Sequence, residues 1–194
     1  MGIIQRKLWL VGAMLLGLLL AGCGAPPPSS TPDDVARLEQ AILALGPGID
    51  PEEAARAARV SYEATARLAV AYEIEDGPLV HNMKVNAGTK PRGLCRHWAE
   101  DMEKALNAEG FRTLEIHRGI AHARNPILLE HSTSIISRRG DSMYDGIVVD
   151  PWREGGHLTW IATREDRRYP WEPRLAVLKW KQETGRTKRV SRAD

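Results

Sequence analysis

The chain has 194 residues, of which 43% are hydrophobic, and it carries 27 Lys and Arg against 25 Asp and Glu. Without Arg6 and Lys7, which belong to a leader described below, 25 basic side chains face 25 acidic ones and the net charge is zero. This balance argues against the basic surface with which proteins bind nucleic acid, so no nucleic-acid partner is expected.

The N-terminus has the pattern of a bacterial export signal. A basic pair precedes an apolar run over residues 8–20, which is shorter than a membrane-spanning helix. The sequence LAGC that ends at Cys23 resembles the lipobox of bacterial lipoproteins. This resemblance implies that residues 1–22 are a signal peptide and that Cys23 carries the lipid, whereas an ordinary signal peptide that contains a Cys is the alternative. Since Gly24 and not Asp follows, the resemblance also implies the outer membrane, on its periplasmic side.

The segment after the leader has a composition that cannot build a core. Residues 23–32 include the sequence GAPPPSSTP, and Pro and Ser favour extended, solvated backbone. We therefore expect a tether here, followed by one domain over residues 33–194.

Helices are predicted in the first half of this domain. Apolar residues recur at helical spacing over 33–45 and are followed by GPG. Asp50 and Pro51 are an N-cap and a first helical residue, so an Ala-rich helix should extend from residue 51 to about residue 75. Residues 79–92 are predicted to be irregular. A third helix should begin at the sequence GLCRHWA, residues 93–99.

The pattern then changes to that of strands. Alternating or β-branched segments predict three strands, over residues 113–117, 128–137 and 144–150. A turn signal at 138–141 lies between the last two strands, and a last helical segment is predicted over 172–183. Helices followed by antiparallel strands indicate an α+β domain.

Cys95 is left without a partner if Cys23 is lipidated, because the chain has two cysteines. A free thiol is a liability in an oxidising compartment, and inert burial is its default interpretation. However, Cys95 follows Gly93-Leu94 at the predicted start of a helix. Helix N-termini favour thiolates, and their free N–H groups can donate to an oxyanion.

A nucleophilic thiol also needs a base and a group that orients it. His131 lies in one β-rich segment and Asp150 ends the next, so a hairpin could place them side by side. The pieces GLCRHWA, EHSTSI and VVDPW, in this order, resemble the transglutaminase-like superfamily within the papain-like cysteine peptidase fold. The resemblance implies that Cys95 is the nucleophile, His131 the general base and Asp150 the orienting carboxylate. Ser132 and Trp152 depart from the family's pattern and leave the substrate and reaction open.

The remaining polar residues receive weaker interpretations. Papain-like folds place a second oxyanion donor upstream of the nucleophile, and of Asn82 and Asn86 we favour Asn86, although both could cap turns. His97 is interpreted as structural or substrate-adjacent. No HExxH motif or paired CxxC is present, so neither a metal nor a cofactor is expected.

The sequence thus predicts a lipid-anchored envelope enzyme, a hydrolase or acyltransferase that acts on an amide or peptide bond in the cell envelope. Two alternatives stay open. One is a non-catalytic binding or assembly lipoprotein on the same fold, in which Cys95 is buried away from His131. The other is a redox-sensing thiol, which would need neither His131 nor Asp150.

Overall fold

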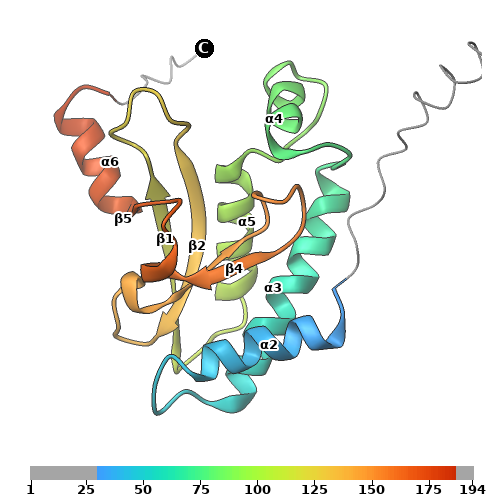
Figure 1. Ribbon diagram of the computed structural model, residues 1–194, viewed down its shortest axis with the longest axis vertical. Coiled ribbons are helices and arrows are strands. Elements are labelled where there is room, and N and C mark those ends of the chain that lie inside the picture. The colour runs from blue at the N-terminus through green and yellow to red at the C-terminus, as the bar shows by residue number, and fades with distance from the viewer. Residues whose placement is uncertain (1–29, 187–194) are drawn as a thin grey trace, which may run out of the picture.

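The computed structural model describes residues 30–186, which form five α-helices and one five-stranded antiparallel sheet in the order β4-β3-β2-β1-β5 (Figure 1). The elements are α2 (Pro32–Leu43), α3 (Pro51–Ala71), α4 (Pro78–Asn86), α5 (Cys95–Asn107), β1 (Leu114–Ala121), β2 (His131–Arg138), η1 (Met143–Asp145), β3 (Ile147–Asp150), β4 (Thr159–Ala162), η2 (Thr163–Glu165), β5 (Trp171–Pro173) and α6 (Arg174–Glu183). The predicted signal peptide and Cys23 lie outside the described residues. No helix within residues 30–186 is apolar over the length that a membrane crossing requires.

The first two helices begin at side-chain caps. Thr31 accepts a hydrogen bond from the N–H of Asp34 at the start of α2, and Asp50 accepts one from the N–H of Glu52 at the start of α3. The helix α3 ends at Ala71, four residues before the predicted end, because the backbone turns left-handed just beyond it, at Glu73 (φ +54°).

The prediction that residues 79–92 are irregular is wrong for α4. Pro78 occupies the first helical position, where its missing N–H costs nothing. The apolar Leu79, Val80 and Met83 are exposed, while the polar His81 is buried. This helix therefore lacks the apolar stripe by which a sequence reveals a helix.

The central strands were predicted and the edge strands were not. The strand β2 pairs with β1 over its whole length and with β3 beyond the predicted turn, and it begins at residue 131, three residues later than expected. The strands β4 and β5 lie at the two edges of the sheet, in the part of the chain after residue 150, where no strand was predicted. They have only four and three residues, too few for an alternating pattern to be recognised.

The two faces of the sheet carry different cores. Ile136 and Val149 face the larger core, together with Met102 and Leu106 of α5. Figure 1 shows α3 and α5 next to each other on this side of the sheet, with α6 at the β5 edge. The alternate residues of the strands face a smaller cluster on the other side, whose buried members are Ala121, Ile135, Met143, Val148, Tyr169 and Trp171.

Candidate functional site

Three elements bring the predicted triad to one end of the sheet. His131 is the first residue of β2 and Asp150 is the last of β3, and antiparallel pairing puts these two positions next to each other. Both side chains are 1% exposed. Cys95 is the first residue of α5, which packs on the sheet, and it is half-buried.

The Asp150 carboxylate binds three donors. His131 Nε2 lies 2.5 Å from Asp150 Oδ2, and the Arg153 Nε–H donates to the same oxygen at 2.8 Å. The Trp152 backbone N–H donates to Asp150 Oδ1 at 3.1 Å. The carboxylate is thereby held in a fixed orientation, which in turn fixes the imidazole.

Electrostatics favour the ionised form of this pair. Burial of the imidazole opposes its protonation, but the charge and hydrogen bond of Asp150, helped by Cys95, raise the pKa of His131 to about 9. Burial likewise disfavours the Asp150 carboxylate, yet His131 and Arg153 together lower the pKa of Asp150 below its usual value. A proton is therefore held on the imidazole at neutral pH.

The other ring nitrogen of His131 is the one available for chemistry. His131 Nδ1 is buried and has no hydrogen-bond partner among the described residues. The Cys95 thiol donates to the carbonyl of Glu130, the residue directly before His131, with a sulfur–oxygen distance of 3.7 Å. Cys95 is also one of the groups that raise the pKa of His131. The thiol thus lies beside a ring whose far nitrogen is already bound to a carboxylate.

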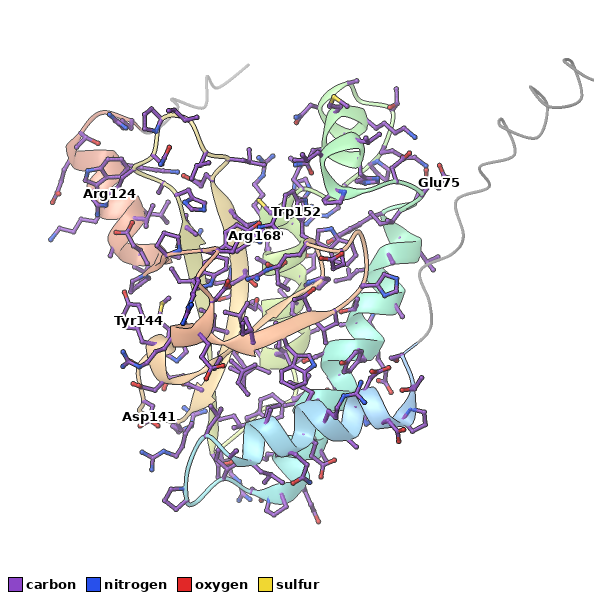
Figure 2. The ribbon with its side chains drawn as sticks, in the orientation of Figure 1. Glu75, Arg124, Asp141, Tyr144, Trp152 and Arg168 are labelled. Atoms are coloured by element: carbon purple, nitrogen blue, oxygen red, sulfur yellow. The ribbon has the colours of Figure 1, made fainter. Side chains whose placement is uncertain are left out.

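Three aromatic rings enclose the imidazole. The ring centroids of Trp152, Tyr169 and Trp171 lie 4.7, 4.6 and 5.5 Å from that of His131. Figure 2 shows Trp152 near the end of α5 that faces α4. These rings keep water from the imidazole and restrict its rotation, which strengthens its interaction with Asp150.

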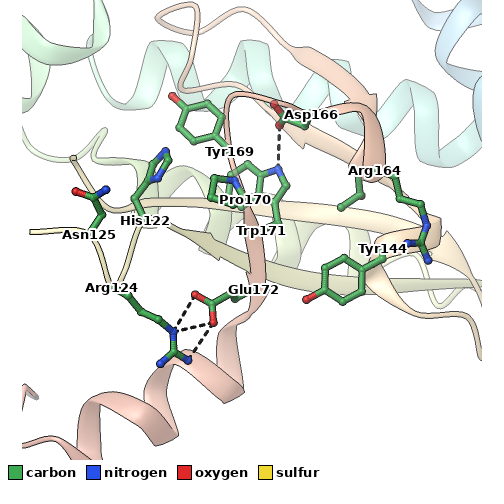
Figure 3. Close-up of a pocket in the computed structure, with 11 residues that line it drawn as sticks. His122, Arg124, Asn125, Tyr144, Arg164, Asp166, Tyr169, Pro170, Trp171 and Glu172 are labelled. Atoms are coloured by element: carbon green, nitrogen blue, oxygen red, sulfur yellow. Dashed lines mark hydrogen bonds and ion pairs between the residues drawn. The ribbon is translucent and has the colours of Figure 1, made fainter. Parts of the chain in front are cut away.

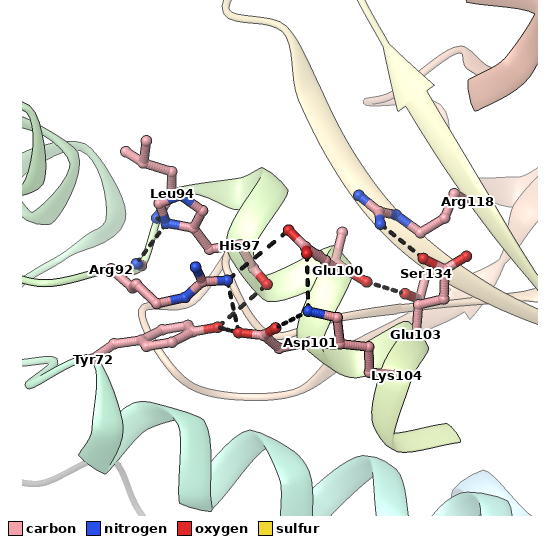
Figure 4. Close-up of polar contacts among 12 residues, drawn as sticks. Tyr72, Arg92, Leu94, His97, Glu100, Asp101, Glu103, Lys104, Arg118 and Ser134 are labelled. Carbon is pink, nitrogen blue, oxygen red and sulfur yellow. Dashed lines mark hydrogen bonds and ion pairs between the residues drawn. The ribbon is translucent and has the colours of Figure 1, made fainter. Parts of the chain in front are cut away.

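The backbone around Cys95 is held by a histidine. His97 Nδ1 accepts hydrogen bonds from the N–H groups of Gly93 and Leu94, at 3.2 and 3.4 Å (Figure 4). Burial, with the nearby charges of Arg92 and Arg96, lowers the pKa of His97, so the ring stays neutral and can accept. His97 therefore has a structural role in shaping the start of α5.

A second histidine fixes the same segment from α4. His81 is buried, and its Nε2 lies 2.8 Å from the Arg92 carbonyl oxygen. Gly93 adopts a left-handed backbone conformation (φ +121°) against this ring, where a Cβ would lie 2.3 Å from Nε2. Only glycine allows the chain to pass this close to His81 before it enters α5.

Of the two candidate oxyanion donors, the structure links Asn82 to the site. Its Oδ1 accepts a hydrogen bond from Trp152 Nε1 at 3.1 Å. Asn86, the predicted donor, lies one turn further along α4, where it is exposed. The choice between them depends on the direction of α4, a helix that the sequence did not reveal.

Sequence reasoning missed Arg153 and Asp166. The Arg153 side chain is 7% exposed and bridges Asp150 to Asp166, which accepts two hydrogen bonds from the guanidinium. The position of Arg153, three residues after Asp150, was the only available signal. Among residues 30–186, no three His, Cys, Asp or Glu side chains form a group that could hold a metal ion.

A pocket of about 570 Å³ lies beyond the aromatic enclosure. Figure 3 shows that Tyr169 and Trp171 line it, whereas none of the three triad residues does. Its Arg124 and Glu172 side chains form an ion pair at 3.0 Å, so they largely neutralise each other.

Comparisons of the chain with family models, with curated proteins and with solved structures give no match.

Proposed function

We propose that the chain is a thiol enzyme that cleaves or transfers the acyl group of an amide or peptide bond, on a transglutaminase-like, papain-like fold. The observation that carries this proposal is the 2.5 Å contact between His131 Nε2 and Asp150, in a buried site beside Cys95. Because this contact occupies Nε2, Nδ1 is the nitrogen that exchanges a proton with the Cys95 sulfur.

The reaction starts from an ion pair at neutral pH, in which the Cys95 proton already resides on His131 Nδ1 and the sulfur is a thiolate. The thiolate attacks the substrate carbonyl carbon, and the imidazolium then gives its proton to the departing amine. The resulting thioester is attacked by water or by a second amine, from which His131 takes a proton. Asp150 keeps the ring oriented and stabilises its positive charge throughout.

The oxyanion that forms during attack needs donors. The Cys95 N–H stands in the first turn of α5, where N–H groups have no partner within the helix. A side-chain amide of α4 is the proposed second donor. Asn86 remains our prediction from the sequence, and the bond from Trp152 makes Asn82 the other candidate.

We propose from the lipobox-like sequence at Cys23 that the enzyme is anchored to the outer membrane and faces the periplasm, with peptidoglycan stem peptides or periplasmic proteins as substrates. The chain expressed in a Gram-negative bacterium should then enter the detergent phase in a detergent partition, and Cys23→Ser should move it to the aqueous phase. Equal partition of both proteins would contradict the anchor.

One observation favours a second candidate function, a non-catalytic binding module. The Cys95 thiol donates to the Glu130 carbonyl and not to the imidazole. A module of this kind needs no acyl transfer, so the reactivity of its Cys95 thiol should not depend on His131.

An acyl donor distinguishes the two functions. We would treat the full chain in a Cys23→Ser background, where Cys95 is the only thiol, with p-nitrophenyl acetate and map acetylation by mass spectrometry. The enzyme should acetylate Cys95 and release acetate or pass it to an added amine, and both Cys95→Ala and His131→Gln should reduce this by at least about 100-fold. Equal acetylation of Cys95 in wild type and His131→Gln would contradict the proposed function.

A further inference from the structure

A hydrogen-bonded row of alternating charges continues beyond the triad. The His131 imidazole binds the Asp150 carboxylate, which binds the Arg153 guanidinium, which in turn binds the Asp166 carboxylate. The last two side chains are 7% and 3% exposed. Four ionisable groups thus share one buried site, where their mutual effects are stronger than at a surface.

The outer pair is built into the enclosure around His131. The Arg153 guanidinium lies over the Tyr169 ring, 4.5 Å from its centroid, and Asp166 accepts a hydrogen bond from Trp171 Nε1 at 2.9 Å. Both rings pack on His131. The pair therefore orients the rings that confine the imidazole as well as the carboxylate that binds it.

The charges have opposite effects on the imidazolium. A guanidinium alone next to Asp150 would cancel much of the attraction between Asp150 and a protonated His131. A carboxylate on the far side of the guanidinium reduces this cancellation. The arrangement can therefore hold Asp150 firmly while weakening its interaction with His131 less than a guanidinium alone would.

We propose that Arg153 and Asp166 are positioning residues: the guanidinium holds the Asp150 carboxylate against His131, and Asp166 offsets the charge that the guanidinium brings to the imidazole. This inference rests on the proposed function, because it concerns the base of that reaction. Among residues 30–186, the other ionisable groups that face His131 are Cys95 from α5 and Tyr169 from the segment before β5.

The proposal predicts shifts of opposite sign. Asp166→Asn keeps the shape and leaves the guanidinium charge uncompensated, so the imidazole should titrate about one pH unit lower than in wild type. Arg153→Met removes the positive charge, so the imidazole should titrate about one unit higher. Arg153→Lys keeps the charge and should stay closer to wild type than Arg153→Met. Asp145→Asn, at an exposed ion pair with Arg164, is the matched control and should shift nothing.

The measurement is the NMR titration of the His131 imidazole in the full chain, assigned by its loss in His131→Gln, with near-ultraviolet circular dichroism to verify folding. Opposite shifts in Asp166→Asn and Arg153→Met support the proposal. Shifts of the same sign, or no shift in either folded variant, overturn it. If Arg153→Met does not fold, the test uses Asp166→Asn and Arg153→Lys. A titration midpoint of His131 that is lowered in Asp166→Asn and unchanged in Arg153→Lys supports the proposal, and any other result overturns it. The measured quantity is the titration of His131 and not the acylation of Cys95. The result can therefore be interpreted even if the chain proves not to catalyse acyl transfer.

Discussion

His131 is the residue on which the site depends, and burial gives its two nitrogens different tasks. Nε2 is committed to Asp150, while Nδ1 has no partner among the described residues. In water either nitrogen can carry the proton of the neutral ring, and half of the rings would be in the charged, doubly protonated form near pH 6.5. In the folded chain Asp150 leaves Nδ1 as the nitrogen that would react in the proposed mechanism, and it keeps the imidazole protonated to higher pH.

The raised pKa of His131 makes stability depend on pH. The folded pKa is about 9 against 6.5 for an unperturbed imidazole, so the contribution of the protonated ring is complete below pH 6.5 and is lost as the pH rises to about 9. We expect the free energy of unfolding to fall by about 1–3 kcal/mol over this interval. The measurement is urea denaturation at a series of pH values, in a Cys95→Ala background that removes the titration of the thiol. In the same background, Asp150→Asn should flatten the curve, and an equal slope in both proteins would contradict the assignment.

The helix α5 presents Cys95 because neighbouring elements hold the segment before it. His97 binds two N–H groups of that segment from within α5, and His81 binds its Arg92 carbonyl from α4. The sequence predicted the start of α5 because glycine, a helical apolar stripe and a stop signal are local features. It could not predict α4 as a support, because the residue that α4 buries most fully is the polar His81.

We predict that Gly93→Ala lowers the stability more than the same substitution at another glycine with a left-handed backbone conformation. Gly88 has φ +75°, and no atom lies within 4 Å of the point that a Cβ would occupy, so Gly88→Ala should destabilise by about 1 kcal/mol through backbone strain alone. Gly93→Ala adds a clash with His81 and should lose roughly 1–3 kcal/mol more. Denaturant unfolding of both variants measures the difference. Equal losses would show that the contact between His81 and Gly93 is not tight.

A buried carboxylate joins the helices to the sheet. Glu53 of α3 accepts hydrogen bonds from the N–H groups of Arg112 and Thr113 and from the Thr113 hydroxyl, at 2.6–2.8 Å, just before β1. Burial opposes ionisation of Glu53, but these bonds outweigh it and lower the pKa of Glu53 to about 2. Its stabilisation is therefore complete above pH 4.5 and is lost as the pH falls toward 2.

We expect Glu53→Gln to lower the free energy of unfolding by about 1–3 kcal/mol at pH 7, because an amide cannot accept all three bonds with one oxygen. The deficit should shrink when thermal unfolding is repeated between pH 4.5 and 2. Glu52→Gln, at the exposed neighbouring position, is the control and should change little. A deficit that is independent of pH would show that the charge of Glu53 does not matter.

At the scale of the whole molecule, local sequence patterns predicted the scaffold of the site better than its surroundings. The α+β class, the start of α5 and the β2–β3 hairpin follow from periodicity and turn residues, and the hairpin alone brings His131 to Asp150. Arg153 and Asp166 meet across a 13-residue separation that includes β4, and no periodic pattern encodes such a loop closure. The aromatic enclosure is equally non-local, since Tyr169 and Trp171 come from a segment without recognisable periodicity.

In the proposed enzyme, the Cys95 sulfur, the His131 imidazole and the Asp150 carboxylate act as one unit. The most direct test is the rate of Cys95 alkylation by iodoacetamide as a function of pH, measured in the full chain with Cys23→Ser. We predict a rapid rate at neutral pH that falls at least about tenfold in both His131→Gln and Asp150→Asn, because each change removes the partner that stabilises the thiolate. A rate that rises only near pH ~8.5, as for a free thiol, and is the same in all three proteins would contradict the account.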